Sequence, residues 1–407
     1  MNRRDLLKNG LGLALGLGAN LTATSSFAAP FLPQQSQQAQ QARLLLVFLR
    51  GGYDASNLLI PTSSSFYYEA RPNIAIAKPS SDSNSALALN ADWGLHPALR
   101  ETIYPLYQQG QVAFIPFAGT DDLSRSHFET QDSIELGQAL NTTRNFKSGF
   151  MNRLAAQIGG GVASMSFTDQ LPMVMQGQAE VANFSLRQVN RANVDGRQSQ
   201  IIEQMYQNTA MSKQVQDGFK VRGEVIRDMQ SEMNEANRNA ISTKGFELEA
   251  KRIAKMMREK YALGFIDVGG WDTHVNQGAA QGTLANKFEE LGRGLLAYQQ
   301  EMGSAWKNTT VVVISEFGRT FKENGKQGTD HGHGSVYWVL GGSVKGGRVL
   351  GEQMQLTPKS LFQNRDYPIL NEYRSIFAGL FAEMYGLNNV QLDAIFAGVK
   401  AQRLGLV

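Results

Sequence analysis

Five apolar runs divide the chain from residue 43 onward, and each is soon followed by glycine or polar residues. The runs are continuous and lack the alternation of a strand with one face in water. Continuous runs of this length are typical of strands covered on both faces, as in the middle of a parallel sheet. We therefore expect β-strands at 43–49, 112–117, 262–268, 309–314 and 336–340.

Apolar residues also recur at helical spacing between these runs and near the C-terminal end. The spacing predicts helices at 97–109, 127–140, 284–302 and 371–385. Strands that alternate with helices favour an α/β fold with a doubly wound, mostly parallel sheet. Ligands of such sheets bind at the carboxyl ends of the strands, so the residues just after each run are the candidates for function.

Residues 197–260 have a different composition, rich in Gln, Glu, Lys, Arg, Met and Asn and almost free of Gly and Pro. The segment is long enough for two or three amphipathic helices. We interpret it as a helical insertion beside the sheet.

The N-terminal residues have the features of an export signal. Arg3 and Arg4 precede a Gly-rich apolar stretch at 11–17, and Ser26-Phe27-Ala28 fits a cleavage site. These features predict a twin-arginine signal peptide at 1–28, the twin-arginine translocation machinery as a partner, and a periplasmic or extracellular location. The apolar stretch is too short to span a bilayer, so no permanent membrane anchor is expected. A Gln-rich linker at 29–42 then leads into one large domain at 43–407.

Charge and cysteine content exclude several function classes. The formal net charge is +3 over 407 residues, without a basic run interleaved with aromatic residues, so nucleic acid is not an expected partner. The chain has no Cys. This excludes disulfides, Cys-ligated zinc, iron–sulfur clusters and a thiolate nucleophile, and leaves oxygen and nitrogen ligands.

The first polar motif, at 50–57, follows the opening strand, and its glycines allow a sharp turn. Asp54 then lies at the carboxyl end of the strand, where a metal ligand would be useful. A turn or a helix cap formed by Asp54 is the alternative interpretation. His96 directly precedes Pro97, and we expect it to be a structural residue at a helix entry.

The second motif, at 124–129, opens the predicted helix 127–140. A hydroxyl such as that of Ser126 at a helix N-terminus gains from the positive end of the helix dipole, and the Arg125 guanidinium suits phosphate or sulfate. A capping box made by Ser126 and Glu129 is an equally good interpretation of the same residues.

Two further motifs follow the next strands. Asp272 and His274 point the same way if their segment is extended, and they offer one oxygen and one nitrogen ligand to the same ion. Glu316 directly follows another strand. A carboxylate buried there must either bind a metal ion or pair with a cation such as Arg319.

The segment 328–334 holds the densest group of candidate ligands, with Asp330, His331 and His333 in a glycine-framed loop. Imidazoles beside a carboxylate suit zinc, manganese or iron. The whole set is large enough for two divalent ions in one site, with zinc, manganese, calcium and iron as candidates. The expected metal ligands are Asp54, Asp272, His274, Glu316, Asp330, His331 and His333.

A family resemblance that covers residues 44 to about 387 is carried by the motifs FLRGGYDASNLLIP, LHPAL, SRSHFETQD, GGWDTH, VVVISEFGRT, GTDHGHG and VLGGSVKGG. In these motifs the chain resembles the twin-arginine-exported bacterial proteins grouped as domain-of-unknown-function family 1501, placed near the alkaline phosphatase and sulfatase superfamily. The resemblance implies an alkaline-phosphatase-like α/β sheet and a two-metal hydrolytic site. A reaction is implied only by the superfamily.

The resemblance also assigns roles to individual residues. Asp54 resembles the first metal carboxylate of the superfamily, and Asp272 with His274 resembles the later Asp/His pair. Ser126, with Ser124 as second choice, is similar in position to the nucleophile. Where the superfamily usually has an Asp-His pair after the next strand, this chain has Glu316, so either Glu316 or the later loop supplies that ligand. The segment Ser124-Arg125-Ser126-His127 does not fit the motif of aldehyde-type sulfatases.

Three functions stay open at this stage. The leading hypothesis is an exported metal-dependent hydrolase of phosphate or sulfate esters, with Ser126 as nucleophile and Arg125 or Arg319 binding the anion. Its substrate would be a small-molecule or polysaccharide ester. The second is a non-catalytic binding or assembly protein that retains the fold. The third is a metal-dependent enzyme that acts on a polysaccharide by hydrolysis or elimination.

Overall fold

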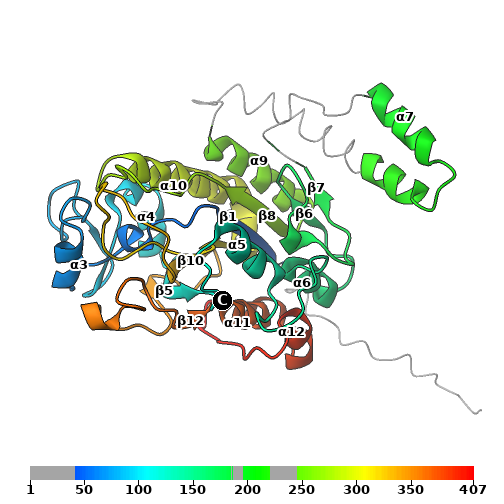
Figure 1. Ribbon diagram of the computed structural model, residues 1–407. Coiled ribbons are helices and arrows are strands. Elements are labelled where there is room, and N and C mark those ends of the chain that lie inside the picture. Colours follow the sequence, from blue (N-terminus) through cyan, green and yellow to red (C-terminus); the bar gives the residue numbers. More distant parts are fainter. Residues whose placement is uncertain (1–41, 185, 187–195, 221–244) are drawn as a thin grey trace, which may run out of the picture. The chain divides into compact units, whose positions relative to one another are not determined.

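The computed structural model describes residues 42–184, 186, 196–220 and 245–407, all within the unit Ser36–Val407 (Figure 1). The predicted signal peptide and residues 29–41 of the predicted linker lie outside the described residues. Among the residues described, no helix is both long enough and apolar enough to cross a membrane.

All five predicted strands are present, and they form the middle of one sheet. They are β1 (Arg43–Leu49), β5 (Val112–Gly119), β8 (Leu263–Val268), β9 (Thr309–Ser315) and β10 (Ser335–Gly341). Four short strands complete this sheet: β6 (Ser164–Ser166), β7 (Ala182–Asn183), β11 (Arg348–Val349) and β12 (Asn371–Glu372). A separate small sheet contains β2 (Leu59–Pro61), β3 (Leu87–Ala88) and β4 (Trp93–Leu95).

The strand order in the large sheet is β11-β5-β10-β9-β1-β8-β6-β7, and β12 also pairs with β5. The central strand β1 pairs in parallel with β8 and β9. Among the described strands of this large sheet, only β10 runs antiparallel to its neighbours, β5 and β9, and the other pairings are parallel. The prediction of an α/β fold with a mostly parallel sheet is confirmed.

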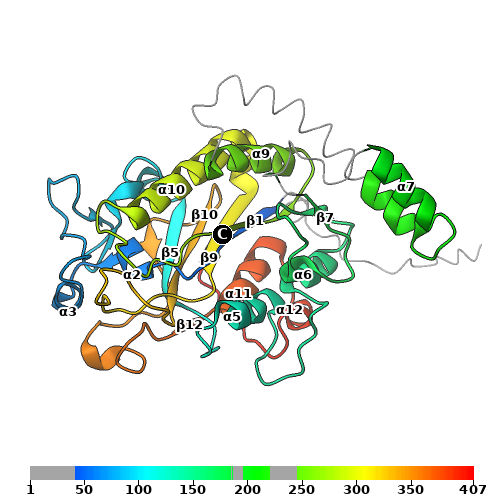
Figure 2. The ribbon, with the colours of Figure 1, turned by 45° about the horizontal axis from the view of Figure 1, so that its top comes forward.

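Alternate residues of β1 contribute to two separate cores. Leu45, Val47 and Leu49 pack into a core that includes α4 (Ile103–Gln108), α9 (Phe246–Glu259) and α10 (Thr283–Met302). Leu44 and Phe48 pack into one that includes α6 (Phe150–Ile158), α11 (Tyr373–Tyr385) and α12 (Asn389–Ile395). Figure 1 and Figure 2 show α9 and α10 on one side of the sheet and α11 and α12 on the other. Both faces of the sheet are therefore covered, which explains the continuous apolar runs.

The α-helices that lie wholly within the described residues are α2 (Ala55–Leu58), α3 (Ser65–Ala70), α4 (Ile103–Gln108), α5 (His127–Leu136), α6 (Phe150–Ile158), α7 (Gly196–Tyr206), α9 (Phe246–Glu259), α10 (Thr283–Met302), α11 (Tyr373–Tyr385) and α12 (Asn389–Ile395). The 3-10 helices are η1 (Pro97–Leu99), η2 (Met173–Met175), η4 (Gly303–Asn308) and η5 (Pro358–Ser360).

Three predicted helices differ from the structure, one by a break within it and two at an end. The predicted helix 97–109 is divided into η1 and α4, because Thr102 adopts a non-helical backbone conformation. Helix α5 ends at Leu136 because Gly137 caps it in the left-handed region, with φ of 61°. Residues 371–372 pair as β12, and α11 begins only after its N-cap residue Glu372.

The predicted insertion 197–260 is described at its two ends, and residues 221–244 lie outside the described residues. Its last part is α9, whose apolar side chains, including Ile253 and Met257, pack into the same core as α10. This end of the segment therefore belongs to the helical layer on the sheet.

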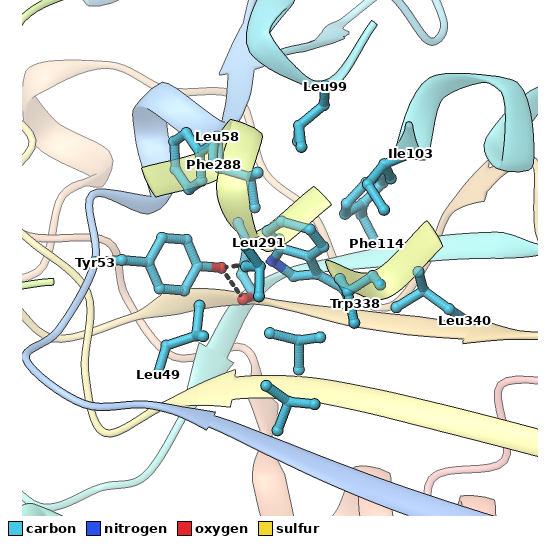
Figure 3. Packing of buried hydrophobic residues seen from close by; sticks show 14 of the residues in the cluster. Leu49, Tyr53, Leu58, Leu99, Ile103, Phe114, Phe288, Leu291, Trp338 and Leu340 are labelled. Atoms are coloured by element: carbon cyan, nitrogen blue, oxygen red, sulfur yellow. Dashed lines mark hydrogen bonds between the residues drawn. The ribbon is translucent and has the colours of Figure 1, made fainter. Parts of the chain in front are cut away.

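A buried aromatic group fixes the turn that follows β1 (Figure 3). The Tyr53 hydroxyl accepts a hydrogen bond of 3.1 Å from Trp338 Nε1 and donates one to the carbonyl oxygen of Val336. The Tyr53 ring also makes an edge contact with Phe288 on α10. Since Gly51 and Gly52 directly precede Tyr53, these contacts hold the glycine turn against β10.

Candidate metal centre

Segments that follow the strands bring four polar side chains together. Asp272 and His274 follow β8, His127 begins α5 after β5, and His331 lies in the loop between β9 and β10. The four side chains come from three segments that are far apart in the sequence. The sheet topology places the ends of these strands at one edge, where α/β proteins bind ligands.

The carboxylate of Asp272 lies at the centre of the cluster. Its Oδ1 atom lies 2.8 Å from His274 Nε2 and 3.2 Å from His331 Nε2, and its Oδ2 atom lies 3.5 Å from His127 Nε2. The Nε2 atoms of His274 and His331 are 3.2 Å apart. The Asp272 side chain is 42% exposed, so the cluster is accessible from solvent. We call these four residues the His₃Asp cluster.

Each imidazole of the His₃Asp cluster has an oxygen acceptor beside its other ring nitrogen, Nδ1. The distances are 2.7 Å from His127 to Glu316 Oε1, 3.2 Å from His274 to Asp330 Oδ1, and 3.0 Å from His331 to the carbonyl oxygen of Arg125. An acceptor at Nδ1 fixes the tautomer and leaves Nε2 free to bind a metal ion. Within the described part of the chain, His127 Nε2 is buried and has no hydrogen-bond partner.

Glu316 holds His127 through the hydrogen bond at its Nδ1 atom. Its buried carboxylate also accepts hydrogen bonds from the Gly51 amide at 2.8 Å, from Gln131 Nε2 at 2.9 Å and from Ser315 Oγ at 2.8 Å. Burial favours a raised pKa for Glu316, but the hydrogen bond from His127 and the others outweigh it and lower that pKa. The same hydrogen bond raises the pKa of His127.

Arg319 is fully buried and holds Asp272. Its guanidinium donates to the Asp272 carboxylate and to the carbonyl oxygens of Gly51, Gly52 and Thr329. Burial acts to raise the pKa of Asp272, but the positive charge of Arg319 outweighs it and lowers that pKa. Arg319 therefore supports the cluster instead of facing an anion, and its carboxylate partner is Asp272 instead of the predicted Glu316.

The predicted nucleophile and the second predicted anion-binding residue lie beside the cluster. Ser126 is the N-cap of α5, and its hydroxyl accepts from the Glu129 amide at 3.5 Å. This is one half of the predicted capping box, since the Ser126 amide donates to Ser124 Oγ and not to the Glu129 side chain. Arg125 is a non-glycine residue with φ of 51°, in the left-handed region. Its guanidinium donates to Asp366 Oδ2 at 2.7 Å and to Gln363 at 2.6 Å. Ser124 Oγ lies 3.1 Å from Thr130 Oγ1.

Four predicted ligands lie outside the His₃Asp cluster: Asp54, Glu316, Asp330 and His333. Asp54 is fully buried, and both of its oxygens accept from the Arg71 guanidinium, at 2.5 and 3.0 Å. A carboxylate paired in this way is a poor metal ligand, because metal binding would leave the buried cation unpaired. The His333 ring packs on Phe362, and burial lowers its pKa to about 4. Asp330 contacts the cluster through His274 Nδ1.

Sequence reasoning missed His127 as a ligand. The residue stands at the first position of a predicted helix that follows a strand, which is a signal that could have identified it. The expected structural role of His96 is confirmed, since His96 caps η1 through the Ala98 amide and lies 3.0 Å from the carbonyl oxygen of Ala279.

Residues 41–396 match the family model described as "Protein of unknown function (DUF1501)". The chain belongs to this family. The family resemblance seen in the motifs is thereby confirmed for DUF1501. No curated protein matches this DUF1501 chain.

Two of the solved structures that the DUF1501 chain matches are crystal structures of Ps i-CgsB. The structure in complex with k-i-k-neocarrahexaose is 12% identical, covers 89% of this chain and 75% of that one, and gives a TM-score of 0.38. The other is 11% identical, covers 86% and 73%, and gives 0.35. Similarity at this level supports no conclusion about shared fold or chemistry.

Proposed function

We propose that this DUF1501 protein is an exported metal-dependent hydrolase of phosphate or sulfate esters, related to the alkaline phosphatase and sulfatase superfamily. The observation that supports a metal centre best is the geometry of the His₃Asp cluster. Three imidazoles converge on one carboxylate, and each has an oxygen acceptor at its outer nitrogen. This combination is typical of zinc sites with histidine and carboxylate ligands.

The donor set fits one divalent cation held by His127, Asp272, His274 and His331. Among the described residues, one group of potential ligand atoms lies close enough to hold a metal ion, and it contains His127, Asp272 and His331. His274 adds an Nε2 atom at the same carboxylate oxygen. We therefore propose one ion at this cluster, where the sequence led us to expect two.

The chain's own residues would divide the remaining work. A bound cation would act as a Lewis acid on an ester oxygen. Ser126 offers the nearby hydroxyl as nucleophile, which would bond to phosphorus or sulfur while the ester alcohol departs, and water would then release the acid and restore Ser126. Glu316 and Arg319 would hold His127 and Asp272 in place. Twin-arginine export of the loaded protein stays part of the proposal.

A specific observation favours a second candidate, the non-catalytic binding protein. Both arginines predicted to bind the anion already pair with carboxylates, Arg125 with Asp366 and Arg319 with Asp272. The Ser126 hydroxyl is also engaged as a helix cap. A protein of this kind would hold the metal ion without turning over an ester.

Metal content and turnover separate the two candidates. We expect about one zinc, manganese or iron ion per chain by elemental mass spectrometry, with loss of the ion in Asp272→Ala and His331→Ala. His333→Ala is the matched control, because it removes a buried histidine outside the cluster. Release of phosphate or sulfate from aryl esters that is lost in Ser126→Ala would support the hydrolase. Metal binding without any turnover would favour the binding protein, and a folded protein that takes up no metal would refute the metal-dependent hydrolase and leave a binding protein without a metal.

A further inference from the structure

A chain of buried hydrogen bonds connects Asp54 to two of the three segments that carry the cluster, the loop with Asp272 and His274 and the loop with His331. Asp54 accepts from Arg71 on one side and from Gln277 Nε2 on the other, the latter at 2.6 Å. The Oε1 atom of Gln277 accepts from Thr273 Oγ1 at 3.2 Å and from Thr329 Oγ1 at 3.1 Å. All five side chains are buried.

The partners of Gln277 determine the orientation of its amide. A carboxylate can only accept hydrogen bonds, so the NH₂ group of Gln277 must face Asp54. The carbonyl oxygen then faces the two threonine hydroxyls, which can donate. Each polar atom of the Gln277 side chain therefore has a partner of the correct kind, and loss of both threonine donors would leave its buried oxygen unsatisfied.

The two threonines lie next to functional residues in different loops. Thr273 stands between Asp272 and His274, and Thr329 directly precedes Asp330 and His331. The two hydrogen bonds from these threonines to Gln277 therefore tie the loop with Asp272 and His274 to the loop with His331.

Backbone contacts join the loops along the same line. The Thr329 amide donates to the carbonyl oxygen of Thr273 at 3.2 Å, and the Gln277 amide donates to that of Gln327 at 3.0 Å. At Gly328 an added Cβ atom would lie only 2.3 Å from the carbonyl oxygen of His274. The loops are packed backbone to backbone, so a small shift of one moves the other.

We propose that Gln277 is a positioning residue for the metal centre. It connects the loop with Asp272 and His274 to the loop with His331, and the ion pair of Asp54 with Arg71 anchors it. Asp54 thus acts on the centre through Gln277, without contact to the ion. The inference rests on the proposed function, since it requires that the His₃Asp cluster binds a metal ion.

Cobalt binding tests this role, because the visible absorption of Co²⁺ reports the geometry of its ligands. We expect Gln277→Ala to raise the Kd for Co²⁺ roughly tenfold, as changes around metal ligands commonly do, and to alter the absorption spectrum. Thr273→Val combined with Thr329→Val removes only the two hydroxyl donors. This double variant should show the same change, and it decides the question if Gln277→Ala does not fold.

Asn152→Ala is the matched control. Asn152 is a buried residue on α6, and its side-chain amide donates to the carbonyl oxygens of Met175 and Ala179. Helix α6 packs into the hydrophobic core on the other face of the sheet. We expect it to lower Tm about as much as Gln277→Ala while the Kd and the spectrum for Co²⁺ stay at the wild-type values.

The outcomes separate the inference from the proposed function. Wild-type Kd and spectrum in both the Gln277 and the threonine variants would overturn the positioning role and leave the metal centre intact. An equal loss of affinity in Asn152→Ala would overturn it as well, because the effect would then follow from stability alone. A wild-type protein that binds no Co²⁺ would overturn the metal centre itself.

Discussion

At the scale of single residues, Glu316 differs most from its predicted role. Its carboxylate accepts from His127, Gly51, Gln131 and Ser315, so every partner is a donor. A carboxylate that accepts four hydrogen bonds has few lone pairs left to bind a metal ion. Glu316 therefore orients the imidazole of His127, and through it would act on the candidate metal centre.

We expect Glu316→Gln to weaken metal binding by roughly 10- to 100-fold, the range found for residues that support metal ligands. The amide oxygen can still accept from His127, but the substitution removes the negative charge that strengthens this hydrogen bond and raises the pKa of His127. Isothermal titration with Zn²⁺ measures the change. Glu129→Gln is the control, because Glu129 is an exposed acid on α5, the helix that begins at His127. This variant should bind Zn²⁺ as the wild type does. Equal affinities of the wild type and Glu316→Gln would exclude this role.

Residue types and their spacing predicted part of the candidate centre. Asp272, His274 and His331 were expected ligands, and they lie together. Asp54 could not be excluded from the sequence, because its partner Arg71 lies in a separate segment and no local pattern links the two. The order of charges along a chain does not reveal which carboxylate a buried guanidinium will meet.

At the scale of elements, the strands were the most predictable part of the fold. Strands covered on both faces must be apolar throughout, so β1 and β9 are evident as continuous runs. Helix ends were less predictable, because they depend on single cap residues such as Gly137 and Glu372. The antiparallel direction of β10 depends on the path of the loop before it, which apolar patterning does not report.

The N-cap of η1 predicts a pH dependence of stability. His96 is fully buried, and its uncharged ring can accept from the Ala98 amide and donate to the carbonyl oxygen of Ala279. Burial lowers the pKa of His96 from 6.5 to about 4. Because the unfolded chain binds this proton more readily, stability is complete above about pH 6.5 and falls as the pH drops toward 4, by about 3 kcal/mol in total.

Urea unfolding between pH 4 and 8 measures this effect against His96→Asn, which can still cap through its side-chain oxygen. The difference in unfolding free energy between the two proteins should shrink as the pH falls from 6.5. His333, whose pKa is also lowered to about 4, titrates in both proteins and cancels in the difference. A difference that is constant with pH would show that His96 carries no such linkage.

At the scale of the whole molecule, the candidate centre joins parts of the chain that are distant in sequence. His127 lies 204 positions before His331, and Asp272 lies between them. A preformed ligand set of this kind cannot exist in the unfolded chain. Metal binding must therefore stabilise the folded state, by an amount set by the free metal concentration and its dissociation constant.

This linkage gives a prediction that needs no substrate. Zn²⁺ at about 100 times its Kd should raise the free energy of unfolding by about 2.7 kcal/mol, and a chelator should reverse the gain. Asp272→Ala should abolish the gain, because it removes the candidate metal ligand whose carboxylate contacts all three histidines of the cluster. His333→Ala should keep the gain in full. Thermal and urea unfolding with and without Zn²⁺ provide the measurement. Equal stabilisation of the wild type and Asp272→Ala would place the bound ion elsewhere on the chain, since only a centre at Asp272 makes the gain depend on that carboxylate.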